Sequence, residues 1–153
     1  MLFRIRKVKA DDLKAFVDVY KSAYKGMEEY AYKKDKEIKR YFRWLLKRDE
    51  NGFFVAEVEG EAVGFVACDA YWHNFFDEEM GEIHEIVVLE KCKGKGIGKK
   101  LIENAEKYLK KKGYRKTGLW VGEKNHVAIK FYEKLGYKKG EKFGKWRRMI
   151  KEM

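Results

Sequence analysis

The feature that most constrains this chain is an apolar segment that runs into a glycine-rich turn and then into a helical pattern. Residues 86–89 are all apolar, and Gly94-Lys95-Gly96-Ile97-Gly98 follows after four intervening residues. Apolar side chains then recur at helical spacing as far as Leu109. Glycines let a backbone approach a ligand closely, and the first N–H groups of a helix are unpaired donors. The segment therefore predicts a cradle for an anionic ligand such as a phosphate.

Two familiar phosphate-binding motifs do not fit this turn. A dinucleotide-binding fingerprint that begins at Gly94 requires a third glycine where the chain has Lys99. A P-loop that ends at Gly98-Lys99 requires glycine and a hydroxyl residue where the chain has Lys93 and Lys100. Both motifs are excluded, and a glycine turn without a ligand remains the alternative explanation of this segment taken alone.

The spacing of apolar residues along the whole chain predicts an α/β (α+β) order of elements: strand, two helices, three strands, helix, strand, helix, strand. Because no linker or repeat interrupts this pattern, we expect a single domain over residues 1–153. The expected strands are Phe3–Val8, Phe53–Val58, Ala62–Tyr71, Glu82–Leu89, Lys116–Val121 and Trp146–Ile150, and the expected helices are Asp12–Tyr24, a stretch after Asp35, one from Ile97 to Gly113, and one from Asn125 to Gly136.

The charge of the chain is strongly positive, with 36 Lys and Arg against 25 Asp and Glu and a net charge of +11. Only eight of the cations are Arg, whereas Arg is expected to lead in a protein that reads nucleic acid. Abundant Lys and Glu, with no Pro or Gln, are typical of proteins from hot-living organisms. We therefore regard nucleic acid as an unlikely partner, although a basic surface favours anionic ligands.

The sequence contains no sign of secretion, membrane insertion or a metal site. Its longest apolar runs are too short to span a bilayer, and its N-terminal residues turn charged after the third. Cys68 and Cys92 are too few for a disulfide scaffold. The three histidines, His73, His84 and His126, show no metal-ligand spacing. We expect a cytoplasmic protein with reduced thiols and no metal.

Two motifs resemble the GNAT superfamily of N-acetyltransferases. Residues 88–98 resemble its acetyl-coenzyme A motif, a strand followed by Gln/Arg-x-x-Gly-x-Gly/Ala, although Lys93 replaces the usual Gln or Arg. Residues 125–137 resemble its C-terminal helix, with an Asn, a Tyr and a closing Leu-Gly-Tyr. The element order also matches, so the resemblance covers essentially the whole chain. It implies a mixed central sheet flanked by helices, with splayed strands that form the cleft for acetyl-CoA.

The resemblance further implies that acetyl-CoA is the cosubstrate. Its pantetheine arm would bind the backbone at the apolar end of the central strand, and its pyrophosphate would lie in the glycine turn. Asn125 is a helix N-cap by residue type, and in similar proteins the same residue reaches the pantetheine. The cofactor-binding residues implied are Ile86, Val87, Val88, Lys93, Gly94, Lys95, Gly96, Ile97, Gly98, Lys99, Asn125, Ala128 and Tyr132.

Acetyl transfer to an amine requires a base, because amines are mostly protonated at neutral pH. Glu82 and His84 share one face of their strand by simple alternation, at positions where some members of the family carry a base. Alternation puts Glu85 on the opposite face, and a β-bulge near Ile86 would change this assignment. We expect Glu82 and His84 as the bases. The alternative is that the two glutamates face solvent and His84 is structural.

The reaction also requires an oxyanion donor and a proton for the departing thiolate. Tyr132 matches the tyrosine that supplies this proton in the family, and the alternative for it is a core aromatic beside Phe131. The backbone N–H of Val88 is the simplest oxyanion donor. The resemblance thus implies direct attack of an amine on the thioester, with a non-catalytic acyl-CoA-binding module as the alternative.

The acceptor in similar enzymes enters opposite the cofactor, which here implicates residues 24–34 and 72–82. Both segments are rich in aromatic and acidic side chains, which favours a cationic amine. Surface loops that pack over the core, or that join two copies of the chain in a homodimer, explain the same composition equally well. A small amine, a peptide N-terminus and a protein lysine all remain open as acceptors.

Overall fold

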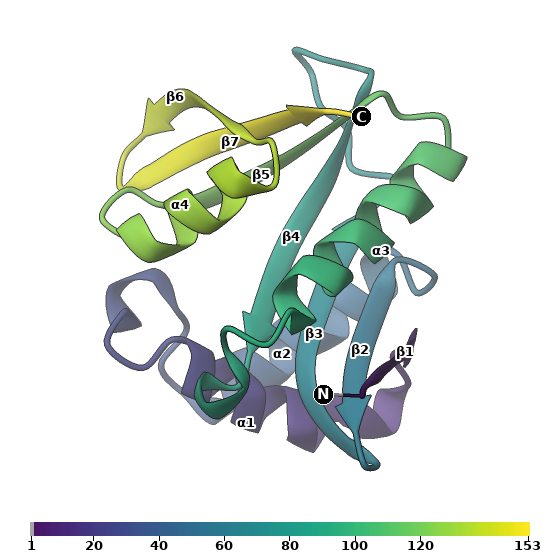
Figure 1. The fold of residues 1–153 in the computed structure, drawn as a ribbon, viewed down its shortest axis with the longest axis vertical. Coiled ribbons are helices and arrows are strands. Elements are labelled where there is room, and N and C mark those ends of the chain that lie inside the picture. Colours follow the sequence, from purple (N-terminus) through teal and green to yellow (C-terminus); the bar gives the residue numbers. More distant parts are fainter. Residues whose placement is uncertain (1) are drawn as a thin grey trace.

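A seven-stranded sheet forms the centre of the structure, a computed structural model that describes residues 2–153 (Figure 1). The strands lie in the order β1-β2-β3-β4-β5-β7-β6, and every neighbouring pair is antiparallel except β4 and β5. Their bounds are β1 Arg4–Lys7, β2 Phe53–Val58, β3 Glu61–Asp69, β4 Met80–Val88, β5 Lys116–Gly122, β6 Lys138–Phe143 and β7 Trp146–Glu152.

Helices cover both faces of the sheet, with α1 and α2 on one face and α3 and α4 on the other (Figure 1). Their bounds are α1 Leu13–Ala23, α2 Asp35–Arg48, α3 Ile97–Lys111 and α4 His126–Lys134, and single 3-10 turns lie at Ala10–Asp12, Glu28–Tyr30 and Glu90–Cys92. The four predicted helices and the mixed, helix-flanked sheet are confirmed.

Two hydrophobic cores hold these layers together. Beneath α1 and α2, neighbouring phenylalanine rings have centroids 5.2–6.2 Å apart. Beneath α3, aliphatic side chains at helical spacing meet the opposite face of the sheet. The first core is built around Phe16, Phe42, Phe53 and Phe65, and the second around Ile97, Leu101, Ile102, Leu109 and Met149. The spacing of apolar residues therefore predicted the buried face of each helix.

Among residues 2–153, strand β6 is the one strand that the sequence analysis missed. Five of its six residues are exposed, and Phe143 is its one large apolar side chain. Such an edge strand has no buried face and therefore no alternation of apolar and polar residues. Its lysines also suit an edge, because charged side chains discourage pairing with another chain.

Strands β4 and β5 part soon after they meet. Only Met80, Gly81 and Glu82 have partners on β5, and beyond them β4 runs away from β5 towards the other end of the molecule (Figure 1). From there β4 keeps only its partner β3, and β5 keeps only β7. The splayed strands implied by the resemblance are thus present, with an open backbone edge on each.

A β-bulge interrupts the alternation of side chains along β4. Glu85 pairs with Ala67 and Ile83 pairs with Cys68, so His84 is the extra residue. Glu82 pairs with Asp69, and the register consequently puts Glu82 and Glu85 on the same face of the sheet. The expectation that Glu85 lies opposite Glu82 was therefore wrong, because the bulge shifts the parity by one residue.

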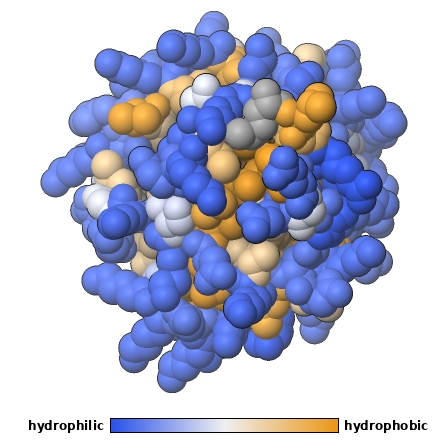
Figure 2. Space-filling model, turned by 60° about the horizontal axis from the view of Figure 1, so that its bottom comes forward, coloured by the Kyte–Doolittle hydropathy of each residue, from blue (hydrophilic) through white to orange (hydrophobic). Residues whose placement is uncertain are grey.

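The surface is mostly hydrophilic on the face shown in Figure 2, as expected for a chain with 40% charged residues. Hydrophobic surface lies in a central band and in isolated spots of this face. Cys68 and Cys92 are both buried and unbridged. Within residues 2–153, no helix has the length and apolar content needed to cross a membrane.

A buried ion pair ties β4 to β7 at the point where β4 and β5 separate. Both guanidinium Nη atoms of Arg148 donate to the two carboxylate oxygens of Glu82, at 2.6 and 2.7 Å. The two residues are only 6% and 3% exposed. Gly118 of β5 lies between them, where a Cβ would be 2.5 Å from one Arg148 nitrogen. Glycine at this position therefore makes room for the guanidinium.

We expect Arg148→Met to lower the free energy of unfolding by about 3 kcal/mol, because it leaves a buried carboxylate without its cation. Denaturant unfolding measures this loss. Arg147→Met is the matched control, since the adjacent pair with Glu123 is more exposed and its loss is expected to be much smaller. The double variant Glu82→Met/Arg148→Met should recover much of the stability. Equal losses for the two single variants would contradict the prediction.

Candidate active site

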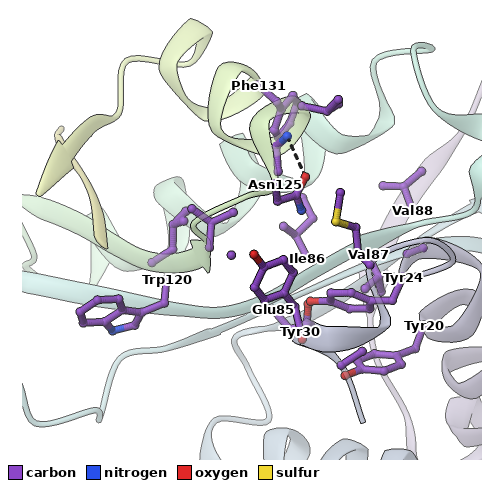
Figure 3. A pocket seen from close by; sticks show the side chains of 18 of the residues that line it. Tyr20, Tyr24, Tyr30, Glu85, Ile86, Val87, Val88, Trp120, Asn125 and Phe131 are labelled. Carbon is purple, nitrogen blue, oxygen red and sulfur yellow. Dashed lines mark hydrogen bonds between the residues drawn. The ribbon is translucent and has the colours of Figure 1, made fainter. Parts of the chain in front are cut away.

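A cavity of about 1110 Å³ lies between the diverging ends of β4 and β5 (Figure 3). One half is bounded by the end of β4, the glycine turn and α4. The other half is bounded by the linker between α1 and α2 and by the ends of β5, β6 and β7. The segments that the resemblance assigned to the cofactor, and one of the two that it assigned to the acceptor, residues 24–34, thus contribute to one continuous space. We call its two parts the cofactor half and the acceptor half.

The glycine turn adopts a backbone that favours glycine. Gly94 and Gly96 have φ angles of +78° and +83°, in the left-handed region, and α3 begins directly after Gly96. Gly98 packs against Phe131, where a Cβ would lie 3.2 Å from the ring. Gly94 and Gly98 line the cavity. The turn therefore brings the N-terminus of α3, with its unpaired N–H groups, to the cofactor half of the cavity.

Most of the residues implied for the cofactor line the cavity. They are Ile86, Val87, Val88, Lys93, Gly94, Gly98, Asn125, Ala128 and Tyr132. Four others, Lys95, Gly96, Ile97 and Lys99, are not among the lining residues. The Ile97 side chain is buried in the core beneath α3, so only its backbone is available to a ligand.

The polar groups near this half suit a phosphate-bearing ligand with an amide-containing arm. The backbone of residues 86–88 has no strand partner on the β5 side and can pair with such an arm as an added strand does. The Asn125 side chain accepts a hydrogen bond from the N–H of Ala128 at 3.3 Å and lines the cavity as well. Lys93 is paired with Glu90 at 3.1 Å, but both side chains are exposed, so Lys93 can still meet an anion.

Glu85 projects into the cavity between two tyrosines. It accepts hydrogen bonds from Tyr24 Oη at 2.5 Å and from Tyr41 Oη at 2.9 Å. Burial raises the pKa of Glu85 to about 7, although both hydrogen bonds oppose the rise. A carboxyl group with this pKa can accept a proton near neutral pH.

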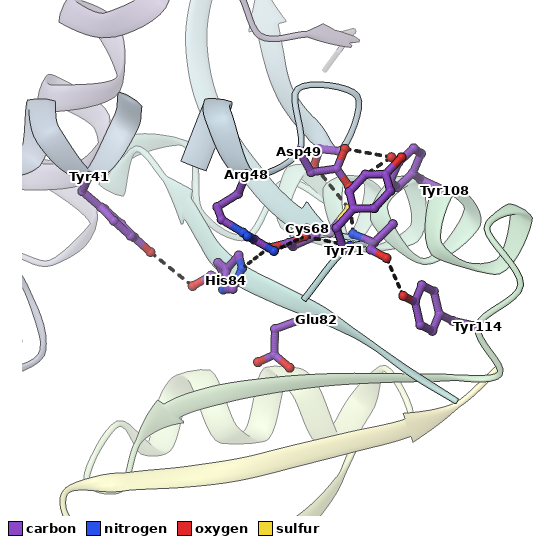
Figure 4. A network of polar contacts seen from close by, with 12 residues as sticks. Tyr41, Arg48, Asp49, Cys68, Tyr71, Glu82, His84, Tyr108 and Tyr114 are labelled. Carbon is purple, nitrogen blue, oxygen red and sulfur yellow. Dashed lines mark hydrogen bonds and ion pairs between the residues drawn. The ribbon is translucent and has the colours of Figure 1, made fainter. Parts of the chain in front are cut away.

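Glu82 is not among the residues that line the cavity. Its carboxylate is held by Arg148, and Figure 4 shows it pointing away from the polar network around His84. An ion-paired, buried carboxylate of this kind is engaged in holding the fold. The structure therefore separates Glu82 from the other two candidate bases.

His84 lines the cavity and is held by a network on the side of α2 (Figure 4). Its Nε2 lies 2.9 Å from Asp69 Oδ2, and Arg48 Nε donates to the same carboxylate at 2.8 Å. Burial raises the pKa of Asp69, but the hydrogen bonds from His84 and Arg48 outweigh it and hold this pKa below its usual value. The rings of Trp44 and Trp72 lie 5.0 and 4.8 Å from the imidazole. Because Nε2 of His84 is hydrogen-bonded to Asp69, it is not available to a ligand in the cavity.

Tyr132 of α4 lines the same cavity as Glu85. It is 7% exposed, and its ring packs against Phe131 and Tyr137 at centroid distances of 5.3 and 5.8 Å. Burial raises the pKa of Tyr132 well above its usual value, and the charge of Glu85 adds to this effect. The hydroxyl therefore keeps its proton at neutral pH.

The acceptor half agrees with expectation in one segment and differs in the other. The linker contributes several lining residues, but none of residues 72–82 lines the cavity, and Phe75 and Phe76 are exposed on the surface. Aromatic residues that sequence reasoning missed take their place, namely Trp120, Phe143 and Trp146. Their aromatic character was visible in the sequence, but Trp120 lies on β5 and the other two lie on the β6–β7 hairpin, and only the tertiary structure brings these strands to the cavity.

Tyr30 connects the linker between α1 and α2 to the end of β5 across the cavity. Its ring lies over Gly122 of β5, where a Cβ would be 2.4 Å from the ring. The Tyr30 hydroxyl accepts a hydrogen bond from the N–H of Lys124 at 3.0 Å, and its ring is 5.4 Å from that of Trp146. Lys145 adds a hydrogen bond to the backbone oxygen of Glu29. These contacts close one side of the acceptor half.

Residues 2–153 contain no group of three or more His, Cys, Asp or Glu side chains placed so that they could hold a metal ion.

Comparison with known proteins agrees with this geometry. The model of the acetyltransferase (GNAT) family matches residues 13–137. An uncharacterized N-acetyltransferase of Methanocaldococcus jannaschii is 49% identical over 152 residues, covering 99% of this chain and 67% of that protein. An uncharacterized N-acetyltransferase of Archaeoglobus fulgidus is 46% identical over 141 residues, covering 92% of this chain and 96% of that protein. These archaeal relatives agree with the compositional expectation of a hot-living source.

Solved structures share the whole fold. A Pyrococcus horikoshii protein of known crystal structure is 42% identical, with a TM-score of 0.88 and 99% of each chain covered. An N-acetyltransferase of Thermoplasma acidophilum, crystallised in complex with coenzyme A, is 25% identical, with a TM-score of 0.83 and 100% of each chain covered.

We expect Gly96→Glu to abolish detectable binding of coenzyme A, because it places a negative side chain where the turn meets the phosphates. Calorimetric titration measures the affinity. Gly60→Glu is the matched control, since Gly60 lies in the β2–β3 turn with a similar φ of +81°, away from the cavity. Retained affinity in Gly96→Glu would show that the cradle lies elsewhere.

Proposed function

The chain belongs to the acetyltransferase (GNAT) family, and on this premise we propose that it transfers the acetyl group of acetyl-CoA directly to a cationic primary amine, with Glu85 as general base and Tyr132 as general acid. One observation carries the proposal. A carboxyl group with a pKa of about 7 and a tyrosine that keeps its proton line the same cavity, beside an open strand edge and a phosphate cradle. The chain thus offers both groups that the two proton transfers need.

The cofactor half supports acetyl-CoA as cosubstrate. When bound, acetyl-CoA supplies an acetyl group activated as a thioester. In this proposal the backbone of residues 86–88 binds the pantetheine arm, Asn125 reaches the same arm, and residues 93–99 hold the pyrophosphate, with Lys95 and Lys99 contributing charge. The coenzyme A complex of the Thermoplasma acidophilum protein supports coenzyme A as the ligand.

Glu85 replaces Glu82 and His84 as the proposed base. Amines have a pKa of about 10 and must lose a proton before they attack. Glu85 accepts that proton, directly or through a water molecule, and the neutral amine nitrogen then bonds to the carbonyl carbon. The Glu82 carboxylate is hydrogen-bonded to Arg148, and the His84 ring is hydrogen-bonded to Asp69, so each is less available than Glu85 to accept a proton from the amine.

The remaining steps use Val88 and Tyr132. The N–H of Val88 donates to the carbonyl oxygen as negative charge develops there. The carbon–sulfur bond then breaks, and Tyr132 donates its hydroxyl proton to the departing sulfur. The nitrogen still carries one proton more than the amide product, and this proton passes to the Tyr132 oxygen through solvent. Glu85 releases the proton that it took from the ammonium to solvent, so both groups return to their starting state.

The acceptor half supports an amine that enters as a cation. Aromatic rings attract cations, and the tyrosines and tryptophans of this half would surround one. Thiol release from acetyl-CoA, measured with peptide N-termini, polyamines, amino acids and lysine peptides, tests the function and identifies the acceptor class. Tight binding of coenzyme A without turnover on any amine would instead indicate a non-catalytic acyl-CoA-binding module.

We expect Glu85→Gln to lower kcat about 100-fold or more, because the amide cannot accept a proton. The affinity for coenzyme A should stay unchanged, as checked by its effect on melting temperature. His84→Gln is the comparison, and its kcat should fall much less. The reverse ranking of the two variants would make His84 the base.

We expect Tyr132→Phe to lower kcat about 100-fold, because the ring stays and only the proton donor is lost. The dissociation constant of acetyl-CoA should change little. Tyr137→Phe is the control, since its hydroxyl donates to Glu106 and it does not line the cavity. Unchanged turnover in Tyr132→Phe would remove this residue from the catalytic assignment.

A further inference from the structure

Each carboxylate oxygen of Glu85 has its own tyrosine. Tyr24, at the C-terminal end of α1, donates to Oε2, and Tyr41 of α2 donates to Oε1. The two donors come from different helices and approach the carboxylate together from the same core. The sequence placed Tyr24 in the segment implicated in acceptor binding and gave no role to Tyr41, and neither was expected to contact a base.

The two hydroxyl groups are held in place by aromatic packing. The Tyr20 ring lies 4.7 Å from that of Tyr24 and 6.0 Å from that of Tyr41. Tyr41 also packs against Trp44 at 6.2 Å, and its hydroxyl lies 3.3 Å from the backbone oxygen of His84. The donors therefore approach Glu85 in fixed directions.

Both tyrosines remain protonated donors across the working pH range. Burial raises the pKa of Tyr24 and of Tyr41 well above the usual value, and the neighbouring charge of Glu85 raises each further. The titratable groups around Glu85 are Tyr20 and Tyr24 from α1, Tyr41 from α2, Tyr32 from the linker, Tyr132 from α4 and His84 from its own strand. Strand β3 presents Ala67 opposite Glu85.

No cation neutralises Glu85 among residues 2–153: no Lys, Arg or His nitrogen lies within 4.0 Å of its carboxylate. Glu82, three residues earlier on the same face, is held by Arg148, and Asp69 is held by Arg48. An adjacent cation lowers the pKa of a carboxyl group and weakens it as a base. Neutral hydroxyl donors also favour the ionised form, but more mildly.

We propose that Tyr24 and Tyr41 are positioning residues that orient the Glu85 carboxylate and keep it ionised without a cation in contact with it. This inference rests on the proposed role of Glu85 as the base. The arrangement balances two opposing effects of the cavity. Burial makes the carboxylate a stronger base, and the two hydroxyl groups prevent burial from leaving it protonated, and so inactive, at neutral pH.

We expect Tyr24→Phe to shift the acidic limb of the pH profile of kcat upward by about one unit, since a hydrogen bond to the ionised form is lost. The base acts when deprotonated. A higher pKa therefore lowers the rate near pH 6 and leaves it largely restored at alkaline pH. Tyr41→Phe should shift the limb in the same direction, and the double variant should shift it further.

Tyr108→Phe is the matched control for these variants. Tyr108 donates to the carboxylate oxygens of Asp49 at 2.8 and 3.0 Å, and neither residue lines the cavity (Figure 4). The substitution therefore removes a tyrosine–carboxylate hydrogen bond without changing the contacts of Glu85. We expect its pH profile to match that of the unmodified protein. Melting curves establish that each variant folds.

A direct titration separates this inference from the proposed function. Carbon NMR of protein labelled at the glutamate carboxyl carbon reports the pKa of Glu85, and the signal absent from Glu85→Gln assigns it. Upward shifts of both the NMR titration and the rate profile support the inference. A shifted NMR titration with an unshifted rate profile would keep the tyrosine contacts but overturn Glu85 as the base. An unshifted NMR titration in Tyr24→Phe and Tyr41→Phe would overturn the positioning role itself.

Discussion

The separation of β4 from β5 is the constraint on which the rest of the molecule depends. Three residue pairs join the two strands, and from Glu82 onward each strand leaves one backbone edge without a partner. Unpaired backbone groups inside a protein are costly, so the open edges must be exposed to solvent or satisfied by a ligand. The ion pair of Glu82 with Arg148 holds β4 to β7 at the point of separation, and Gly118 leaves the room that it needs. The same contacts therefore stabilise the fold and keep the cavity open.

Two carboxylates on one strand have different surroundings and therefore different roles in the proposed mechanism. Glu82 lies against a guanidinium and has little exposed surface, whereas Glu85 lies among tyrosines and faces the cavity. The bulge at His84 puts them on the same face, so residue type and position along the strand do not distinguish them. What distinguishes them is the neighbour supplied by other elements: an arginine from β7 for the first, and hydroxyl groups from α1 and α2 for the second.

The acceptor half depends on a contact between segments that are far apart in the sequence. Tyr30 occupies the space above Gly122 and joins the linker after α1 to the end of β5, and Lys145 adds a contact from the β6–β7 turn. The linker thereby becomes a wall of the cavity instead of a free loop. In the proposed reaction, an aromatic wall of this kind would exclude water from the amine and from Glu85 and so strengthen the electrostatic interactions between them.

The sequence by itself determined the parts of this protein that depend on local order. Periodicity predicted four helices and six of the seven strands, and the glycines at 94 and 96 predicted a turn whose φ angles proved to be positive. Strand β6 was not predicted because an exposed edge strand has no alternation of apolar and polar residues. Only the tertiary structure decided the bulge at His84, the arginine that holds Glu82, and the tyrosines that hold Glu85. Each of these depends on pairing between residues that are distant in the chain, and local periodicity contains no information about such partners.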